Sequence, residues 1–286
     1  MKIRLAATVL FSAQALLIAQ TRDVILAVDL NTHLDPIARF DGVRWGPVPA
    51  TGPGQLSNRM WTRWYAPGNG TSVRLSVAGP TGRCDAPRRL AVSGAQTPPP
   101  GVFDARYVGV AISSAMDVDS LRRMSAASPE WQAVAAAIGP LFDQRAGRQG
   151  VSSSSLARVP MTIDSVFAAS GYGAATAYYF EASKRIPDAG GTPTEDPKGV
   201  LRIAVTGWLR ASGERIVPSG TKSELAWIPD DESSSARPML LPLGVLRQGS
   251  ERVWVMSERL GSIDRFTLYS QGTSVRTLLT VNAAQC

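Results

Sequence analysis

The 286-residue sequence contains a single histidine, His33, and only two cysteines. One histidine confines any Ser-His-Asp mechanism to that position, and it excludes metal sites built from several imidazoles. The strand-turn-helix signature G-x-S-x-G, which presents a nucleophilic serine, does not occur. The sequence therefore contains no motif that predicts catalysis, a metal or another cofactor.

Long apolar runs are also scarce. Residues 5–19 form an uncharged, mostly apolar stretch that follows the basic residues Lys2 and Arg4, and no later segment is apolar enough to cross a membrane. This run is shorter than the roughly 20 residues that span a bilayer, and it ends in small residues. We predict a signal peptide over residues 1–19, with cleavage after Ala15, an uncleaved anchor or a buried helix as alternatives. The mature protein is then secreted or periplasmic, without a transmembrane segment.

Charge of one sign is not concentrated anywhere in the chain. Thirty basic residues outnumber 23 acidic ones, but they are scattered, with adjacent arginine pairs only at Arg88-Arg89 and Arg122-Arg123. A nucleic-acid-binding protein gathers its basic residues on one stripe or tail. We therefore expect no nucleic-acid partner, and predict instead an envelope or extracellular ligand, either a polysaccharide or a protein.

The two cysteines are Cys84 and Cys286. In an oxidising compartment an even pair predicts a disulfide, and two cysteines allow one intramolecular pairing. A bond closing so long a loop would stabilise the fold by about 3–5 kcal/mol. The alternative is a pair of free or intermolecular thiols.

The first half, residues 20–146, is predicted to be rich in β-strands, with helices at about 117–146. Strands are expected at 24–28, 72–77 and 107–112. Asp117 could cap a first helix, and Ser128-Pro129-Glu130 is typical of the start of a second. Gly139-Pro140 should kink or end that second helix. Residues 144–155, rich in glycine and serine, are the predicted linker.

The second half, residues 156–286, shows the period of two that is typical of half-buried strands. It is clearest at 201–210, and comparable runs lie at 174–184, 239–246, 252–256, 265–269 and 274–281. Short glycine-containing turns separate most of them, so neighbouring strands should pair antiparallel. We predict a mainly β (α+β overall) fold of antiparallel sheets, in this half a sandwich or partial barrel, with a small two-helix insert.

The segment DLNTHLD, Asp29 to Asp35, places a potential ligand at every second position. A calcium loop with this start requires glycine at its sixth position and glutamate at its twelfth. Those positions hold Leu34 and Phe40. We therefore interpret the segment as a solvated strand edge or turn rather than a metal or acid–base site.

Two further motifs fail in context. Ser219 and Lys222 match S-x-x-K, but they lie in a predicted hairpin, and the companion motifs S-D-N and K-T-G are missing. Gly171-Tyr172-Gly173 resembles a nucleotide-binding turn, but a strand follows it where such a turn needs a helix. Neither motif predicts chemistry.

The segment WTRWY is the strongest binding candidate, since aromatics beside an arginine can stack on sugars or peptides. Its candidate ligand-binding residues are Trp61, Arg63, Trp64 and Tyr65, although alternation predicts that at least one aromatic is core. The leading hypothesis is a non-enzymatic envelope or extracellular binding or structural module. The alternative is a hydrolase of an extracellular polymer with two carboxyl groups about 5–10 Å apart.

Overall fold

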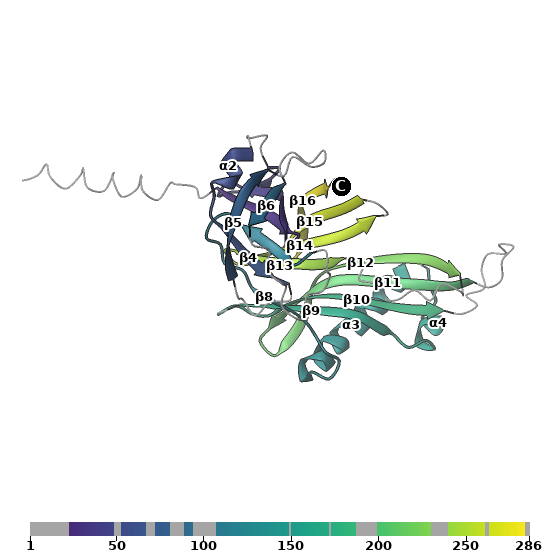
Figure 1. Cartoon of the computed structure of the whole chain (residues 1–286). Coiled ribbons are helices and arrows are strands. Elements are labelled where there is room, and N and C mark those ends of the chain that lie inside the picture. The colour runs from purple at the N-terminus through teal and green to yellow at the C-terminus, as the bar shows by residue number, and fades with distance from the viewer. Residues whose placement is uncertain are drawn as a thin grey trace, which may run out of the picture.

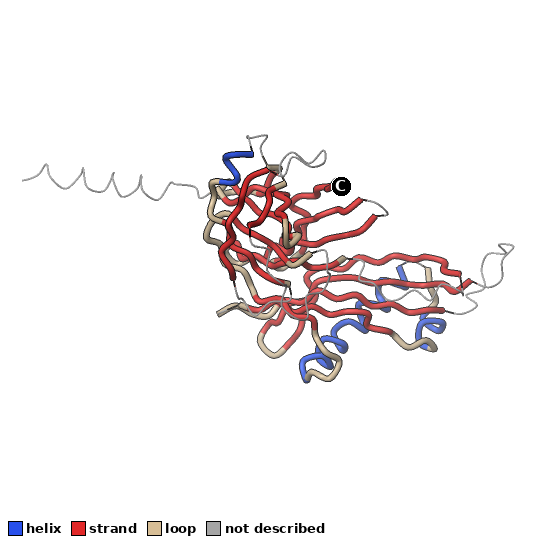
Figure 2. The backbone as a smooth tube through the Cα atoms, viewed as in Figure 1, coloured by secondary structure: helices blue, strands red, loops and turns tan. Residues whose placement is uncertain are grey.

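The computed structural model describes residues 23–48, 53–66, 72–80, 89–93, 107–148, 150–171, 173–186, 199–229, 240–260 and 263–283. It contains a closed β-barrel, a four-stranded sheet, a five-stranded sheet and a helical layer, stacked in that order (Figure 1). Strands make up most of the described chain, as Figure 2 shows. The predicted fold class, mainly antiparallel β, is confirmed.

The barrel is formed by the first six long strands. They are β1 (Val24–Asp29), β2 (His33–Phe40), β4 (Trp61–Tyr65), β5 (Ser72–Pro80), β6 (Leu90–Ser93) and β7 (Gly109–Ile112). Their order is β1-β7-β4-β5-β6-β2, and the pairing of β1 with β2 closes the ring. β3 (Trp45–Gly46) adds to β2, and the short α2 (Pro53–Ser57) contacts β5 and β6. Closure leaves these six strands without a free edge.

The four-stranded sheet is a meander of β13 (Leu241–Gln248), β14 (Glu251–Leu260), β15 (Ile263–Gln271) and β16 (Val275–Ala283). Its alternating side chains are buried on both faces. Leu246, Val253, Val255, Phe266 and Leu268 pack on the barrel, whereas Trp254, Met256 and Tyr269 pack on the five-stranded sheet. This sheet is therefore the shared wall of two cores.

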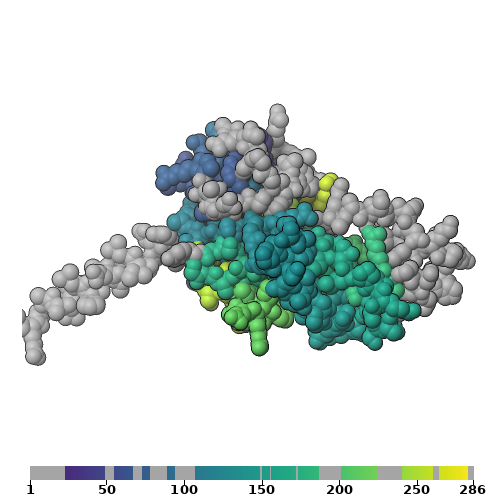
Figure 3. Space-filling model, turned by 90° about the horizontal axis from the view of Figure 1, so that it is seen from below, coloured from purple at the N-terminus to yellow at the C-terminus, as the bar shows by residue number. Residues whose placement is uncertain are grey.

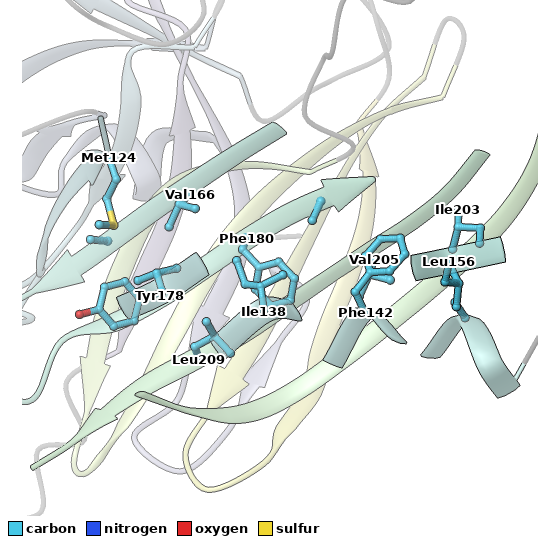
Figure 4. Packing of buried hydrophobic residues seen from close by; sticks show 14 of the residues in the cluster. Met124, Ile138, Phe142, Leu156, Val166, Tyr178, Phe180, Ile203, Val205 and Leu209 are labelled. Carbon is cyan, nitrogen blue, oxygen red and sulfur yellow. The ribbon is translucent and has the colours of Figure 1, made fainter. Parts of the chain in front are cut away.

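The five-stranded sheet has the order β12-β11-β10-β9-β8. Its strands are β8 (Ser120–Arg123), β9 (Thr162–Ser170), β10 (Ala177–Ile186), β11 (Gly199–Ser212) and β12 (Arg215–Pro229). Its outer face is covered by α3 (Pro129–Arg148) and α4 (Ser153–Ala157), and Figure 3 views the molecule from the side of α3, drawn in teal. Val134, Ile138 and Phe142 of α3 pack with Leu156 on this face. Figure 4 shows Ile138, Phe142 and Leu156 against the strands.

Three local predictions are wrong. The helix expected to start at Asp117 is instead β8, because its backbone pairs with β9. The second helix does not end at Gly139-Pro140 but continues to Arg148, since buried contacts at Ile138, Phe142 and Ala146 hold both sides of the proline on the sheet; the alternative of a kink stays a prediction. The predicted linker is largely helical, because it includes the end of α3 and the start of α4.

The strands of the second half are confirmed, and of the two predicted arrangements it is the sandwich that they form, two sheets packed face to face. The closed barrel belongs to the first half instead. The predicted boundary between the halves stays a prediction, although β8, from before the linker, is part of the sheet β8–β12. Among the described residues, no helix is long and apolar enough to cross a membrane.

Candidate ligand-binding groove

The distance between the four-stranded and five-stranded sheets increases towards the right of the view in Figures 1 and 2. A cavity of about 530 Å³ lies between them, and we call it the inter-sheet groove. One wall comes from β11 and β12, the other from β14, β15 and β16. The lining residues are Ala204, Thr206, Lys222, Ser223, Glu224, Leu240, Glu258, Arg265, Thr267, Tyr269, Thr277 and Thr280.

At their closed end the sheets are held together by aromatic packing and one amide. The rings of Trp208 and Tyr269 lie 4.8 Å apart, centroid to centroid. Gln271 is buried, and its Nε2 donates to the carbonyl oxygen of Leu209 across the interface at 2.8 Å, while its Oε1 accepts from Trp254 Nε1 at 2.6 Å. The bond from Nε2 joins the two sheets, whereas the bond from Trp254 lies within the four-stranded sheet and orients the amide for it.

Away from that end, the facing positions change from aromatic to polar. In β11, Thr206 lies two residues before Trp208. In β15, Thr267 lies two residues before Tyr269. Side chains two residues apart share a face of a strand. Because these positions no longer offer apolar surface to bury, the sheets separate there and leave the groove.

The groove presents hydroxyl groups and paired charges. Lys222 Nζ lies 3.0 Å from the hydroxyl of Tyr269 and 4.7 Å from its ring centroid. On the opposite wall Arg265 Nη1 pairs with Glu258 Oε2 at 3.4 Å. The lining therefore contains two positive charges, Lys222 and Arg265, and two negative charges, Glu258 and the exposed Glu224. The lining is polar and close to neutral.

A buried carboxylate supports the floor of the groove. Glu181 Oε1 accepts from the hydroxyl of Tyr179 at 2.7 Å and from the backbone N–H of Leu240 at 2.9 Å. Burial, together with the neighbouring Glu181 charge, raises the pKa of Tyr179 well above its ordinary value of 10.0. Tyr179 therefore remains a neutral donor, and the pair fixes the position of Leu240.

No protein-family model, curated protein or solved structure matches this chain. The site and the sequence are thus the basis for any functional statement.

The four candidate residues of WTRWY lie in β4, outside the groove. Trp61 is fully buried, and its Nε1 donates to the carbonyl of Leu56 at 3.0 Å, while Arg63 is fully buried beside Asp29. Trp64, on the opposite face, packs partly on the core between barrel and sheet and lines a cavity of about 480 Å³. Tyr65 is half-buried, with its ring 5.6 Å from Arg63. Ligand binding by this segment stays a prediction.

The DLNTHLD segment is the turn of the β1–β2 hairpin. Asn31 has a positive φ of 67°, a conformation that asparagine tolerates better than most residues. The predicted turn is present, but the prediction that its acids are solvated is wrong for Asp29, which is fully buried with Arg63. No group of three or more His, Cys, Asp or Glu side chains forms a possible metal site within the part of the chain that is described.

Two predictions fall outside the described residues. These are the signal peptide at 1–19 and the disulfide between Cys84 and Cys286.

Sequence analysis did not identify the groove residues. The sequence feature that could have indicated the groove is in β16. This strand carries Thr277 and Thr280 where a strand of a closed sandwich would carry large apolar residues. Lys222 was considered only as part of a failed catalytic motif. The groove depends on two sheets meeting, and that meeting is a long-range contact that no single strand encodes.

Proposed function

We propose that the protein is an exported, non-enzymatic binding module of the envelope or extracellular space, which holds a polysaccharide in the inter-sheet groove. The observation that carries this proposal is the lining itself: a cavity of about 530 Å³ between two sheets, with hydroxyl groups and balanced charged groups. Binding sites on strands position their side chains more accurately than sites on loops.

The lining suits an uncharged, hydroxyl-rich ligand. Thr206, Thr267, Thr277 and Thr280 each supply a hydroxyl that can donate and accept, whereas the buried ring of Tyr269 is packed against Trp208 and Lys222. The two cationic side chains face as many carboxylates, so the groove has little net attraction for an ion. Carbohydrates are rich in hydroxyl groups that donate and accept hydrogen bonds, which matches these partners.

A hydrolase is the second candidate, because Glu224 and Glu258 line the groove from opposite sheets. Two carboxyl groups across a polymer-sized cleft are the minimal equipment of a glycosidase. However, Glu258 Oε2 lies 3.4 Å from Arg265 Nη1, so a substrate would have to compete with that arginine for the carboxylate. Binding without turnover is therefore the preferred function.

The test is binding of the purified protein to cell-wall and polysaccharide fractions, comparing the wild type with Thr280→Trp. Thr280 is exposed on the edge strand β16, so a tryptophan there narrows the groove without entering the core. We expect at least about a tenfold loss of affinity, equivalent to about 1.4 kcal/mol. Thr32→Trp, an exposed position in the β1–β2 turn, is the matched control and should bind like the wild type.

Equal affinity of the two tryptophan variants would contradict the groove as the binding site. Release of reducing ends during the same incubation, abolished by Glu258→Gln, would replace the binding module with the hydrolase. Retention of a protein and no glycan would assign the groove to a different class of partner.

A further inference from the structure

A second cavity lies at the opposite end of the two sheets, where their loops and hairpin turns meet. Its volume is about 510 Å³. We call it the arginine pocket, because Arg210, Arg247 and Arg252 all line it together with Glu251 and Gln271. The remaining lining consists of small residues in three turns, at 173–175, 249–250 and 272–273, and Ala211. Backbone N–H groups in such turns add to the positive character of a site.

Two of the three arginines are held by one carboxylate behind the pocket. Asp119 has no exposed side-chain surface, and its two oxygens lie 2.9 Å from Arg247 Nε and 2.6 Å from Arg252 Nε. Arg252 also donates to the carbonyl oxygen of Ala175. A buried carboxylate within ion-pair distance of both guanidinium groups holds them in position behind the pocket.

The surroundings of Asp119 fix its own position. Its backbone N–H donates to the carbonyl of Val245 at 2.8 Å, which ties it to β13. A Cβ atom on Gly171 would lie only 2.2 Å from Asp119 Oδ1, so this carboxylate occupies space that any other residue at 171 would fill. The arginine positions are therefore set by the fold rather than by solvent.

Arg210 is the one of these three arginines that does not contact Asp119. Among the described residues it has no ion pair, and its Nε is buried without a hydrogen-bond partner. Glu251, the one acid in the lining, is occupied by Arg276 at 2.9 Å and by the hydroxyl of Ser270. Arg210, Arg247, Arg252 and Arg276 thus outnumber Asp119 and Glu251 by two charges.

We propose that the arginine pocket binds a phosphate monoester, whose dianionic group is held by Arg210 with Arg247 and Arg252. Guanidinium groups match phosphate oxygens in geometry, and a dianion neutralises the excess of two positive charges. The cavity is larger than a bare phosphate, so the ligand carries a further body such as a sugar. This site shares no lining residue with the inter-sheet groove, and it stands if the polysaccharide proposal fails.

The experiment is a calorimetric titration of the full chain with inorganic phosphate, a hexose phosphate and the uncharged hexose, at constant ionic strength. We expect saturable binding of both phosphates, tighter for the hexose phosphate, and none of the free hexose. Arg210→Gln should weaken phosphate binding by at least tenfold. Arg148→Gln, at the exposed end of α3 on the far side of the five-stranded sheet, is the matched control and should bind normally.

Removing an unpaired charge from among arginines relieves repulsion, so Arg210→Gln should unfold at or above the wild-type temperature. If it does not fold, the wild type alone still decides: phosphate must raise its unfolding midpoint saturably, above an equal ionic strength of chloride. Absence of saturable binding, or unchanged affinity in folded Arg210→Gln, would overturn the proposal. Equal binding of phosphate and chloride would reduce the pocket to a nonspecific cationic surface.

Discussion

Inside the barrel, Arg63 and Asp29 form an ion pair from which water is excluded. Arg63 Nη2 donates to Asp29 Oδ1 at 3.0 Å and to the carbonyl of Asn31 at 2.9 Å, and its Nε donates to Asp29 Oδ2. The backbone N–H of Asn31 donates to the same carboxylate at 2.8 Å. Burial raises the pKa of Asp29 above its ordinary value of 3.8, and the hydrogen bonds from Arg63 limit the rise.

This pair makes a prediction at the scale of single residues. Arg63→Met leaves Asp29 buried without its cation, which should lower the free energy of unfolding by about 3–5 kcal/mol at pH 7. The folded-state pKa of Asp29 then rises further, so the folded state binds more protons than the unfolded state. Stability should consequently increase as the pH falls through the window between the raised folded value and 3.8. Urea unfolding at several pH values measures both effects.

The double variant Asp29→Leu/Arg63→Met is the control, because it removes both charges and keeps apolar volume. It should recover most of the stability, since an apolar pair often replaces a buried ion pair at little cost. A single variant as stable as the wild type would show that the pair is dispensable.

At the scale of elements, local patterns predicted the strands well and the helices less well. The alternation at 201–210 is a property of adjacent residues, and β11 spans it. β8 was mistaken for a helix because Val118, Leu121 and Met124 also fit helical spacing, and only the hydrogen bonds to β9 decide between the two. Barrel closure was not predictable, because it requires β4 to pair with β7 and β2 with β6, segments far apart in sequence.

The contact between the barrel and the four-stranded sheet depends on a glycine. A Cβ atom on Gly244 of β13 would lie 2.7 Å from Cγ2 of Val110 in β7. Gly244→Ala should therefore separate the two layers slightly and lower the free energy of unfolding by about 1–3 kcal/mol. Chemical denaturation checks this value.

Gly46→Ala in β3 provides the comparison, because a Cβ atom there meets nothing within 4 Å. Its free energy of unfolding should be unchanged, or raised by up to about 1 kcal/mol through the lower entropy of the unfolded chain. Equal effects of the two alanines would contradict close packing at Gly244.

At the scale of the whole molecule, the sequence predicts an exported chain closed by one disulfide. Mass spectrometry of the protein recovered from periplasm or medium should give a mature chain that begins at Gln20. Alkylation without reduction should leave Cys84 and Cys286 unmodified, and reduction should expose both thiols. Recovery of the intact chain from the cytoplasm, or free thiols in the exported protein, would contradict export and pairing respectively.

The position of β13–β16 at the end of the chain determines when the rest of the fold can complete its packing. The outer face of the barrel and the inner face of the five-stranded sheet both pack on these four strands. A nascent chain that extends only to residue 240 therefore exposes two apolar surfaces to solvent. If the chain is exported amino end first, neither half can bury its apolar face before β13–β16 have crossed. Both halves then complete their packing in the same step.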